Sequence, residues 1–518
     1  MHGSPASGRA AAWTVAALTV AAALLRAPTL GRSLWLDEAW RANVALAPHA
    51  DAFWTQVLGG GGITAPMPPL FALALRAISA VVGHSALGMR ALPVVASVAA
   101  VPLAWVVARR AAGPAAGLVA ALLFAASPTA LLHGQELKQY STDITVVLLL
   151  LAAAGAVART PAPRRWLALA LLESTAPGLS YPSALVLPGI ALATFAACRD
   201  GAARRRWVAA HVVSGAATLA WYALVIGPQR ARPVVAAYWA GDFPPIEGVP
   251  GAGWVVERLG EFLGYASLRP TWLTAMLVVA GLALAARWLG VAALASLATV
   301  VVAAAWRVYP LAGGRTTTFL LPFVYLGVGA AAAPPAGRRP LPAAARALLA
   351  LASAVVVAPT ILAGLRAPAA GVVYEETAPL VAALAAARQP GDRVYVYDGA
   401  VQAFRFHHPA LDPAITLGGS HRSDPAAYGA ELKPFLVPGR RLWLLFSHVH
   451  TAATGRSERD AILADLTPYA RQLDVREAAG GASLHLFEVV RAPGEVRHLK
   501  LTPQDLADPA RMKELLGR

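Results

Sequence analysis

The sequence has little cysteine and little charge. Its 518 residues include one cysteine, Cys198, which excludes an intramolecular disulfide framework. Charged residues make up 14% of the chain, whereas soluble globular proteins carry about 25%. Hydrophobic residues make up 57%, and the mean hydropathy is +0.55. This composition excludes an ordinary soluble domain and indicates an integral membrane protein.

Acidic residues are scarce relative to basic ones. The chain has 28 Asp and Glu against 44 Lys and Arg, a net charge of +16 at pH 7. A basic chain of this kind can bind nucleic acid. Here, however, most arginines form short clusters between apolar runs, where the signals of membrane orientation lie. We therefore expect no nucleic-acid partner, and the sequence has no internal repeat of fixed period.

Long apolar runs occupy most of the first 365 residues. A helix needs about 20 mostly apolar residues to cross a membrane, and this rule predicts about eleven transmembrane helices. They cover roughly 11–30, 87–108, 112–131, 141–158, 166–181, 183–198, 207–226, 271–287, 289–306, 317–333 and 341–363. The shorter apolar run at 67–82 starts with Pro66, Pro68 and Pro69 and contains Arg76. An interfacial or re-entrant helix is expected there.

The arginines indicate which side of the membrane each joint faces. If the N-terminus is cytoplasmic, every cytoplasmic joint is basic. These joints hold Arg9, Arg109, Arg110, Arg159, Arg164, Arg165, Arg199, Arg204, Arg205, Arg206, Arg287, Arg338 and Arg339. Counting 67–82 as a full span would break this pattern. The odd number of spans places the C-terminal part outside, and we expect the first span to be an anchor and not a cleaved signal peptide.

The composition changes after about residue 370, where charged residues become more frequent. We expect a transmembrane domain at 1–365 and a small outside α/β domain at 370–518. Three apolar runs predict strands, and helical patterns fall between and after them. The strands are expected at 393–398, 441–446 and 483–489, and the helices at about 375–388, 424–435, 457–472 and 503–516. His448 and His450 form an H-x-H that could bind a metal, although such pairs are more often polar surface.

Two adjacent acids stand in the first outside loop, in the stretch SLWLDEAWRANVALAP at 33–48. Asp37 could cap a helix, with Glu38 in its first turn, where the helix dipole favours carboxylates. Trp35 and Trp40 would then anchor this helix at the membrane surface. In that interpretation, both acids have a structural role only.

The second outside loop, HGQELKQY at 133–140, is densely polar for a short connection between two apolar spans. It holds Gln135, Glu136, Lys138 and Tyr140. The simpler interpretation is a solvated turn with a Glu136–Lys138 ion pair of little energetic value. A turn alone does not need this density of charge, so a binding or catalytic role is the alternative.

The later outside loops add a cation and several aromatic residues. Arg315 enters a predicted span, where a cation needs a partner or a function, although its side chain could also snorkel to the interface. Its glycine neighbours could let an anionic group approach closely. The long loop at 227–270 holds Tyr238, Trp239 and Asp242, which we expect on the acceptor side. The aromatic residues there could equally form an interface belt.

Together these loops supply acids that can accept a proton and cations that can hold a phosphate. All of them face the same predicted side of the membrane. This is the minimum set of groups for transfer from a phosphate-activated lipid, because a departing phosphate needs charge stabilisation and the acceptor hydroxyl needs a base.

Four motifs carry a resemblance to a known superfamily. They are LWLDEA (34–39), PPLFAL (68–73), QELKQY (135–140) and GRTTTFLLP (314–322). In this order and topology, the chain resembles GT-C membrane glycosyltransferases, in particular the bacterial relatives of protein O-mannosyltransferases and of the aminoarabinose transferase. The resemblance covers most of residues 1–335. It implies a polytopic helical GT-C fold in a bacterial inner membrane and a polyprenyl-phosphate sugar donor used on the outer face.

The resemblance also implies roles for individual residues. Asp37 matches the catalytic base, and Glu38 matches a neighbour that orients this base or binds the sugar. Glu136, with Gln135 and Tyr140, matches a motif that lines the same cavity, and Arg315 matches a cation near the donor phosphate.

Two residues depart from the pattern of the family. Met67 replaces a histidine common in relatives, and Lys138 replaces an arginine, so it cannot grip phosphate bidentately. Some distant relatives use a divalent metal, which Asp37, Glu38 and Glu136 could hold.

Other functions stay open on the sequence alone. A transporter or flippase of lipid-linked sugars should show repeated halves or broken helices in matching positions. A non-catalytic scaffold would use the outside α/β domain to bind a partner. Glu173 and His211 lie within predicted spans and are functional candidates by default, although a packed structural pair fits them equally.

Overall fold

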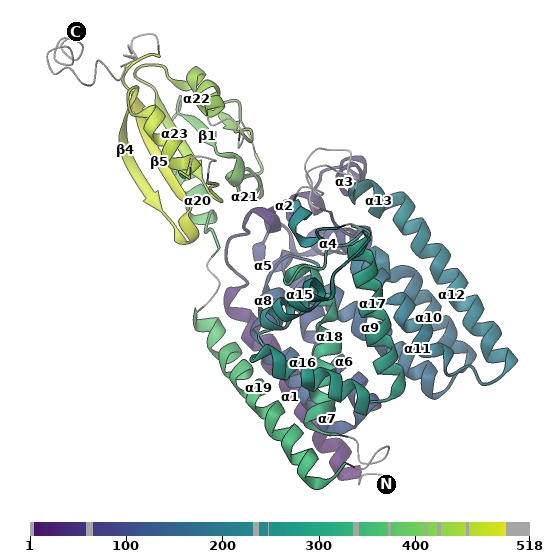
Figure 1. The fold of residues 1–518 in the computed structure, drawn as a ribbon. Coiled ribbons are helices and arrows are strands. Elements are labelled where there is room, and N and C mark those ends of the chain that lie inside the picture. The colour runs from purple at the N-terminus through teal and green to yellow at the C-terminus, as the bar shows by residue number, and fades with distance from the viewer. Residues whose placement is uncertain are drawn as a thin grey trace. The chain divides into compact units, whose positions relative to one another are not determined.

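A computed structural model shows two compact units (Figure 1). The structure describes residues 5–58, 66–230, 238–246, 248–334, 341–370, 374–410, 412–421, 426–451 and 455–493. The helical unit comprises Met1–Arg32 and Trp40–Val372, and the C-terminal unit comprises Ser33–Ala39 and Val373–Arg518. The short segment Ser33–Ala39 of the first loop therefore belongs with the C-terminal unit.

Each predicted span coincides with a helix of the helical unit. The helices are α1 (Pro5–Arg26), α2 (Leu36–Ala45), α3 (Ala50–Leu58), α4 (Pro69–Val82), α5 (Ala86–Met89), α6 (Ala91–Ala112), α7 (Pro114–Ala126), α8 (Pro128–Gln135), α9 (Tyr140–Arg159), α10 (Pro163–Leu179), α11 (Leu187–Phe195), α12 (Gly201–Trp221), α13 (Gly227–Arg230), α15 (Ala252–Tyr265), α16 (Thr271–Leu284), α17 (Arg287–Ala305), α18 (Leu321–Ala332) and α19 (Ala343–Ala370). Within the described residues, six helices alone are long and apolar enough to cross a membrane, or seven if α7 and α8 form one bent span. The fold is thus polytopic and helical, and the count of eleven spans stays a prediction.

Proline and small residues explain much of this helix architecture. Pro69, Pro114, Pro128 and Pro163 each begin a helix, where the missing N–H costs nothing. Helices α16 and α18 pack backbone to backbone, because a Cβ on Gly281 would clash with the carbonyl of Gly327. Small residues allow such close approach between membrane helices, which lack a hydrophobic driving force for association.

Arg26 stabilises the break between α7 and α8, which are bent by 52° at Pro128. The break leaves carbonyl groups without intrahelical donors. The buried Arg26 guanidinium donates to the carbonyls of Phe124 (3.0 Å), Ala125 (3.1 Å) and Ala130 (3.2 Å). Its Nε donates to Ser97 Oγ at 2.9 Å. This single side chain therefore satisfies several polar atoms at the bend inside an apolar bundle.

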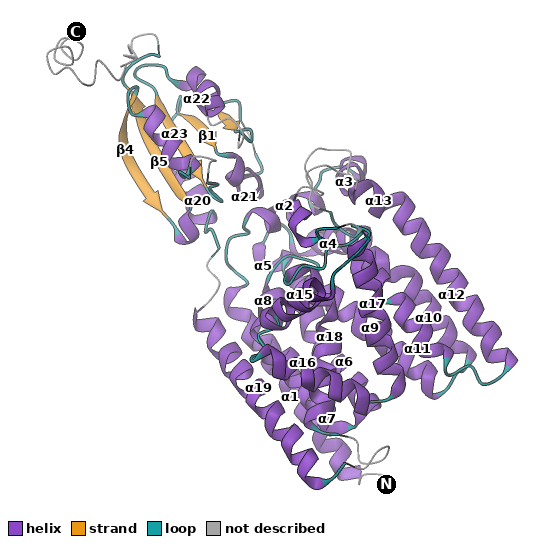
Figure 2. Cartoon of the chain, viewed as in Figure 1, coloured by secondary structure: helices purple, strands orange, loops and turns teal. Residues whose placement is uncertain are grey.

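The C-terminal unit is an α/β domain around a five-stranded sheet (Figure 2). The strand order is β2-β1-β3-β5-β4, with β1, β2 and β3 parallel and β4 and β5 antiparallel to their neighbours. The strands are β1 (Arg393–Val396), β2 (Ile415–Leu417), β3 (Arg441–Phe446), β4 (Ala470–Glu477) and β5 (Ser483–Val489). The helices are α20 (Ala378–Ala387), α21 (Val401–His407), α22 (Ala426–Leu432) and α23 (Glu458–Leu466).

The three predicted strands are confirmed, but the helix expected at 457–472 is wrong in its second half. Helix α23 ends at Leu466, and β4 begins at Ala470. Strand β4 is an exposed edge strand whose side chains are mostly polar on both faces, so its apolar alternation is too weak to detect. Strand β2 has only three residues and gave no signal either. The helix expected at 503–516 lies outside the described residues.

Candidate active site

The turn between α8 and α9 carries the densest polar cluster of the helical unit. Glu136 and Lys138 are both buried, with 6% and 2% of their surface exposed. The Lys138 N–H donates to the Glu136 carbonyl at 2.7 Å, which tightens the turn. The simpler interpretation, a solvated turn, is therefore wrong. Burying two charged side chains costs several kcal/mol each unless they are compensated, so this turn is a candidate functional site.

A buried hydrogen-bonded chain extends from Glu136. The Nδ1 atom of His133 lies 3.3 Å from Glu136 Oε2, and its Nε2 atom lies 2.7 Å from the Tyr265 hydroxyl. Burial, reinforced by the negative charge of Glu136, raises the pKa of Tyr265 above its usual range, and Arg315 acts in the opposite direction. Tyr265 is therefore a neutral hydroxyl at physiological pH, and both Glu136 and Arg315 lie within electrostatic reach of it.

The remaining members of the predicted second-loop motif have different contacts. Tyr140 begins α9, where its ring packs edge-on against His133 at 4.9 Å and lies 6.0 Å from the Lys138 ammonium. Gln135 instead points its amide nitrogen at the end of α1 and donates to the carbonyls of Leu25 (3.2 Å) and Arg26 (3.4 Å). Tyr140 thus belongs to the polar cluster, whereas the hydrogen bonds of Gln135 tie α8 to the end of α1.

Arg315 meets two residues of the long outside loop. It begins the 3-10 turn η5 (Arg315–Leu320), which leads into α18. Its Nη2 donates to the Tyr238 hydroxyl at 2.6 Å, and the guanidinium lies 5.9 Å from the ring of Trp239. Asp242 follows on the short turn Ala240–Asp242, and its N–H donates to the Trp239 carbonyl at 3.0 Å. The predicted phosphate-side cation and the predicted acceptor-side aromatics are therefore neighbours.

The sequence predicts that the glycines before Arg315 let an anionic group approach closely. The space beside them is filled at Gly313 and, within the described part of the chain, open at Gly314. A Cβ on Gly313 would clash with the side chain of Glu261, so a carboxylate of the chain itself occupies that space. Glu261 is in turn paired with Arg258 at 2.9 Å. Gly314 has no atom within 4 Å of the place where its Cβ would lie, among the residues that the structure describes.

Two further charged residues near this cluster escaped the sequence interpretation. Asp143, in the first turn of α9, is 3% exposed and lies within electrostatic reach of Arg41 on the second half of α2, which is 5% exposed. Burial and the nearby charge of Asp143 raise the pKa of Tyr309. An ionisable residue inside a predicted span was the available signal for Asp143. His133 and Tyr265 gave no such signal, because their contact joins residues 132 positions apart.

Asp37 and Glu38 lie in the first turn of α2, in the segment that belongs to the C-terminal unit. The N–H groups of Glu38 and Ala39 both donate to the Trp35 carbonyl, so the helix begins at Leu36 and Asp37 is not its N-cap. Asp37 is half-buried and Glu38 is fully buried. The partial positive charge of the helix N-terminus stabilises both carboxylates.

The other predicted candidates are distinct from this cluster. Glu173 and His211 face each other between α10 and α12, with Oε1 and Nε2 3.5 Å apart. His448 bonds Glu375 at 2.9 Å, and its ring lies 5.1 Å from that of His450. Over the described part of the chain, no three His, Cys, Asp or Glu side chains gather as metal ligands would.

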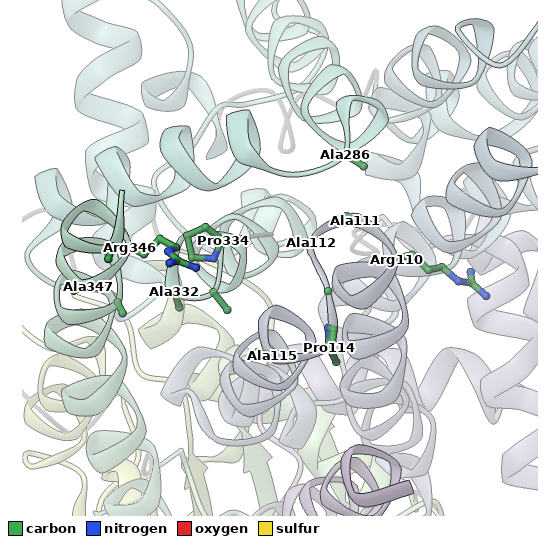
Figure 3. Close-up of a pocket in the computed structure, with 14 residues that line it drawn as sticks. Arg110, Ala111, Ala112, Pro114, Ala115, Ala286, Ala332, Pro334, Arg346 and Ala347 are labelled. Carbon is green, nitrogen blue, oxygen red and sulfur yellow. The ribbon is translucent and has the colours of Figure 1, made fainter. Parts of the chain in front are cut away.

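A cavity of about 800 Å³ lies at the other end of α7, where α6 ends (Figure 3). It is lined mostly by alanines, with two cations, Arg110 and Arg346. Figure 3 shows Arg346 beside Pro334, whereas the Arg110 guanidinium points away from them. Arg110 donates to the Ala152 carbonyl at 3.1 Å. No described lining residue carries a carboxylate, so this cavity offers no base.

Comparison with known proteins finds a family model that matches the part of the chain containing the α8–α9 turn. Residues 66–226 match the family model described as dolichyl-phosphate-mannose-protein mannosyltransferase. No curated protein sequence matches the chain.

Two solved structures of ArnT from Cupriavidus metallidurans resemble the chain over nearly its whole length. In the apo state, the TM-score is 0.53 and the identity 16%, covering 93% of this chain and 98% of ArnT. ArnT bound to undecaprenyl phosphate gives 0.51 and 16%, covering 91% and 97%. These matches confirm the predicted GT-C fold and the predicted resemblance. The segment matched by the family model contains the α8–α9 turn.

Proposed function

We propose that the chain is a membrane glycosyltransferase that moves a sugar from a polyprenyl-phosphate donor to an acceptor hydroxyl. One observation carries the proposal: a buried lysine and a buried carboxylate share the α8–α9 turn, inside the segment that matches a polyprenyl-linked mannosyltransferase family. Undecaprenyl phosphate is the lipid bound to one of the ArnT structures that share the fold.

Lys138 and Arg315 are the proposed phosphate ligands. A cation held out of water stabilises a developing negative charge far more strongly than a solvated one, and it needs no reorganisation during the reaction. Lys138 supplies a compact positive charge. Arg315, half-buried beside Tyr238, has a planar guanidinium that can donate two parallel hydrogen bonds to a phosphate. Glu136, held by His133, and Tyr140 complete the donor side.

Asp37 is the proposed general base. Its carboxylate takes the proton of the acceptor hydroxyl, and the acceptor oxygen forms a bond to the anomeric carbon. The bond from that carbon to the phosphate oxygen breaks, and its electron pair leaves with the polyprenyl phosphate. Glu38 orients Asp37 or binds the sugar, and Tyr238, Trp239 and Asp242 form the acceptor side.

The proposal also fixes an orientation in a bacterial inner membrane. The N-terminus is cytoplasmic, and the α8–α9 turn and the C-terminal domain lie on the outer face, because the basic joints lie on the opposite side. No step of this mechanism passes through a metal ion.

Purified protein in liposomes, supplied with labelled polyprenyl-phosphate sugars and a mixture of membrane acceptors, tests the proposal. We expect labelled glycoconjugate and free polyprenyl phosphate from the wild type. Asp37→Asn should lower the rate at least about a hundredfold, because the base is lost. Equal transfer by Asp37→Asn and the wild type would remove Asp37 from the mechanism. Movement of intact donor across the bilayer without release of polyprenyl phosphate would instead identify a flippase.

A further inference from the structure

The C-terminal sheet has a position where α/β folds commonly bind ligands. Strand β1 connects to β2 on one side and the chain then crosses to β3 on the other, so the strand order reverses between β1 and β3. Ligands of open α/β sheets bind at the carboxyl ends of strands at such a switch point. The two strands end close together here, since a Cβ on Gly399 would lie 2.5 Å from the His448 carbonyl oxygen.

A segment of the chain itself lies at this edge of the sheet. Trp35 is 8% exposed and stacks on Tyr374, with ring centroids 4.9 Å apart and planes 3° from parallel. The same indole lies 6.0 Å from the ring of His448, two residues after the end of β3. His448 is held by Glu375, the neighbour of Tyr374. An aromatic cradle at the switch point therefore holds the tryptophan of the first loop.

Ser33, two residues before Trp35, adds hydrogen bonds that hold the same segment on the C-terminal unit. The N–H and hydroxyl of Ser33 donate to Glu376 Oε2 at 3.1 and 2.8 Å. The Ala378 N–H donates to Ser33 Oγ at 2.9 Å. Ser33 is 3% exposed, so these bonds to a carboxylate are shielded from water and belong to the stronger class of hydrogen bonds.

The docked segment leads directly into the helix of the acids. Trp35 provides the first carbonyl of α2, and Asp37 and Glu38 occupy the first turn. The other end of α2 is held inside the helical unit, where Arg76 donates to the carbonyls of Ala45 (3.2 Å) and Ala47 (2.7 Å).

We propose that the C-terminal domain positions the catalytic turn of α2, with Tyr374 and Glu376 as its positioning residues. This proposal rests on the proposed function, because it assigns these residues to the placement of Asp37 and Glu38. The domain uses its ligand-binding edge for a segment of the same chain, and its contribution to the reaction is the orientation of the base.

Variants on the domain side test the proposal without altering the loop that bears the acids. Tyr374→Ala removes the stack on Trp35, and Glu376→Ala removes the acceptor of Ser33. In the full chain, we expect each variant to speed amide hydrogen exchange at residues 33–39 at least about tenfold, since local opening controls this exchange. We also expect kcat for sugar transfer to fall at least about tenfold with the KM for the donor unchanged.

Conservative variants separate positioning from loss of folding. Tyr374→Phe keeps the stack and Glu376→Gln keeps an acceptor oxygen, so both should retain slow exchange at 33–39 and near wild-type turnover. Arg388→Ala is the matched control, because this residue pairs with Asp412 on the surface of the same unit. It should change neither quantity.

The two measurements also separate this proposal from the proposed function. Unchanged exchange at 33–39 in Tyr374→Ala and Glu376→Ala would overturn the docking, and faster exchange with full turnover would overturn the positioning role. A wild type that transfers no sugar would contradict the proposed function, while its exchange pattern still reports the docking.

Discussion

Lys138 is a cation buried in an apolar bundle, and its charge is the feature that a phosphate ligand needs. Lys138→Met keeps the length of the side chain and removes the charge. We expect kcat/KM for the lipid-phosphate donor to fall about a hundredfold, because the site loses one preorganised positive charge that would stabilise the leaving phosphate. Steady-state kinetics in liposomes measures this fall, with Arg471→Met on exposed β4 as control. Equal kcat/KM in Lys138→Met and the wild type would exclude phosphate binding by this residue.

The imidazole of His133 contacts Glu136 with one nitrogen and Tyr265 with the other, so the three side chains form one hydrogen-bonded network. Tyr265→Phe removes one partner of the imidazole, and His133→Gln removes the link itself. We expect each variant to slow transfer about tenfold and the double variant to be no slower than the worse single one, because residues of one network are not additive. A double variant with the product of both effects would show that the two residues act separately.

His485 makes the C-terminal domain sensitive to acid. Burial lowers its pKa to about 4, below the usual value of about 6.5. Between these values the unfolded chain binds more protons than the folded one, so stability is complete above about pH 6.5 and falls as the pH drops toward 4. The loss amounts to about 3 kcal/mol for this shift.

His485→Phe should remove this dependence, because the ring packs between Phe446 and Phe487 and needs no proton. Hydrogen exchange of peptides from β3 and β5 in the full chain, at pH 7 and pH 4.5, measures the stability of the sheet. The same fall in protection in the variant and the wild type would assign the acid sensitivity to other groups.

The contacts of Arg26 and His133 were beyond the sequence interpretation. Their importance comes from partners about a hundred positions away, such as Phe124 for Arg26 and Tyr265 for His133. Local periodicity carries no information about such pairs. Glu136 and Lys138, by contrast, stood out because charge is rare next to apolar runs, and the structure buries both of them.

At the scale of elements, the bent pair α7 and α8 depends on Arg26. Arg26→Met removes the donor to the Phe124 and Ala125 carbonyls and to the Ser97 hydroxyl, while the Ala130 carbonyl keeps the Ser97 hydroxyl as a donor. Each buried acceptor left without a donor costs about 1–3 kcal/mol. We therefore expect the thermal unfolding midpoint in detergent to fall by about 5–10 °C. Arg9→Met, at an exposed position of the same helix, should leave the midpoint unchanged.

The elements themselves were predictable where the pattern was long or strongly apolar. Each span expected from hydropathy coincides with a helix, and strands β1, β3 and β5 lie where buried runs predicted them. The break at Pro128 was not expected, because the run at 112–131 carries no charge and predicts one continuous span. The hydrogen bonds that Arg26 donates there come from another helix. Strand β4 was missed because an exposed edge strand needs few apolar side chains.

At the scale of the whole molecule, the basic joints predict the orientation. An alkaline phosphatase fused after residue 490 should be active in bacteria, and a fluorescent protein that folds only in the cytoplasm should stay dark at the same position. Both outcomes follow from an outside C-terminal domain. A bright cytoplasmic reporter at this position would reverse the topology and, with it, the side on which the reaction occurs.

The docking of Ser33 on Glu376 also has a consequence for the timing of synthesis. The two residues are separated by 343 positions. At a synthesis rate of about 5–20 residues per second, Glu376 emerges roughly 20–70 s after Ser33. During this interval the first turn of α2 exists without its docking partner. A chain that stops before the last domain keeps its acids but lacks the proposed positioning residues, so we expect a truncated product in the membrane to transfer sugar slowly.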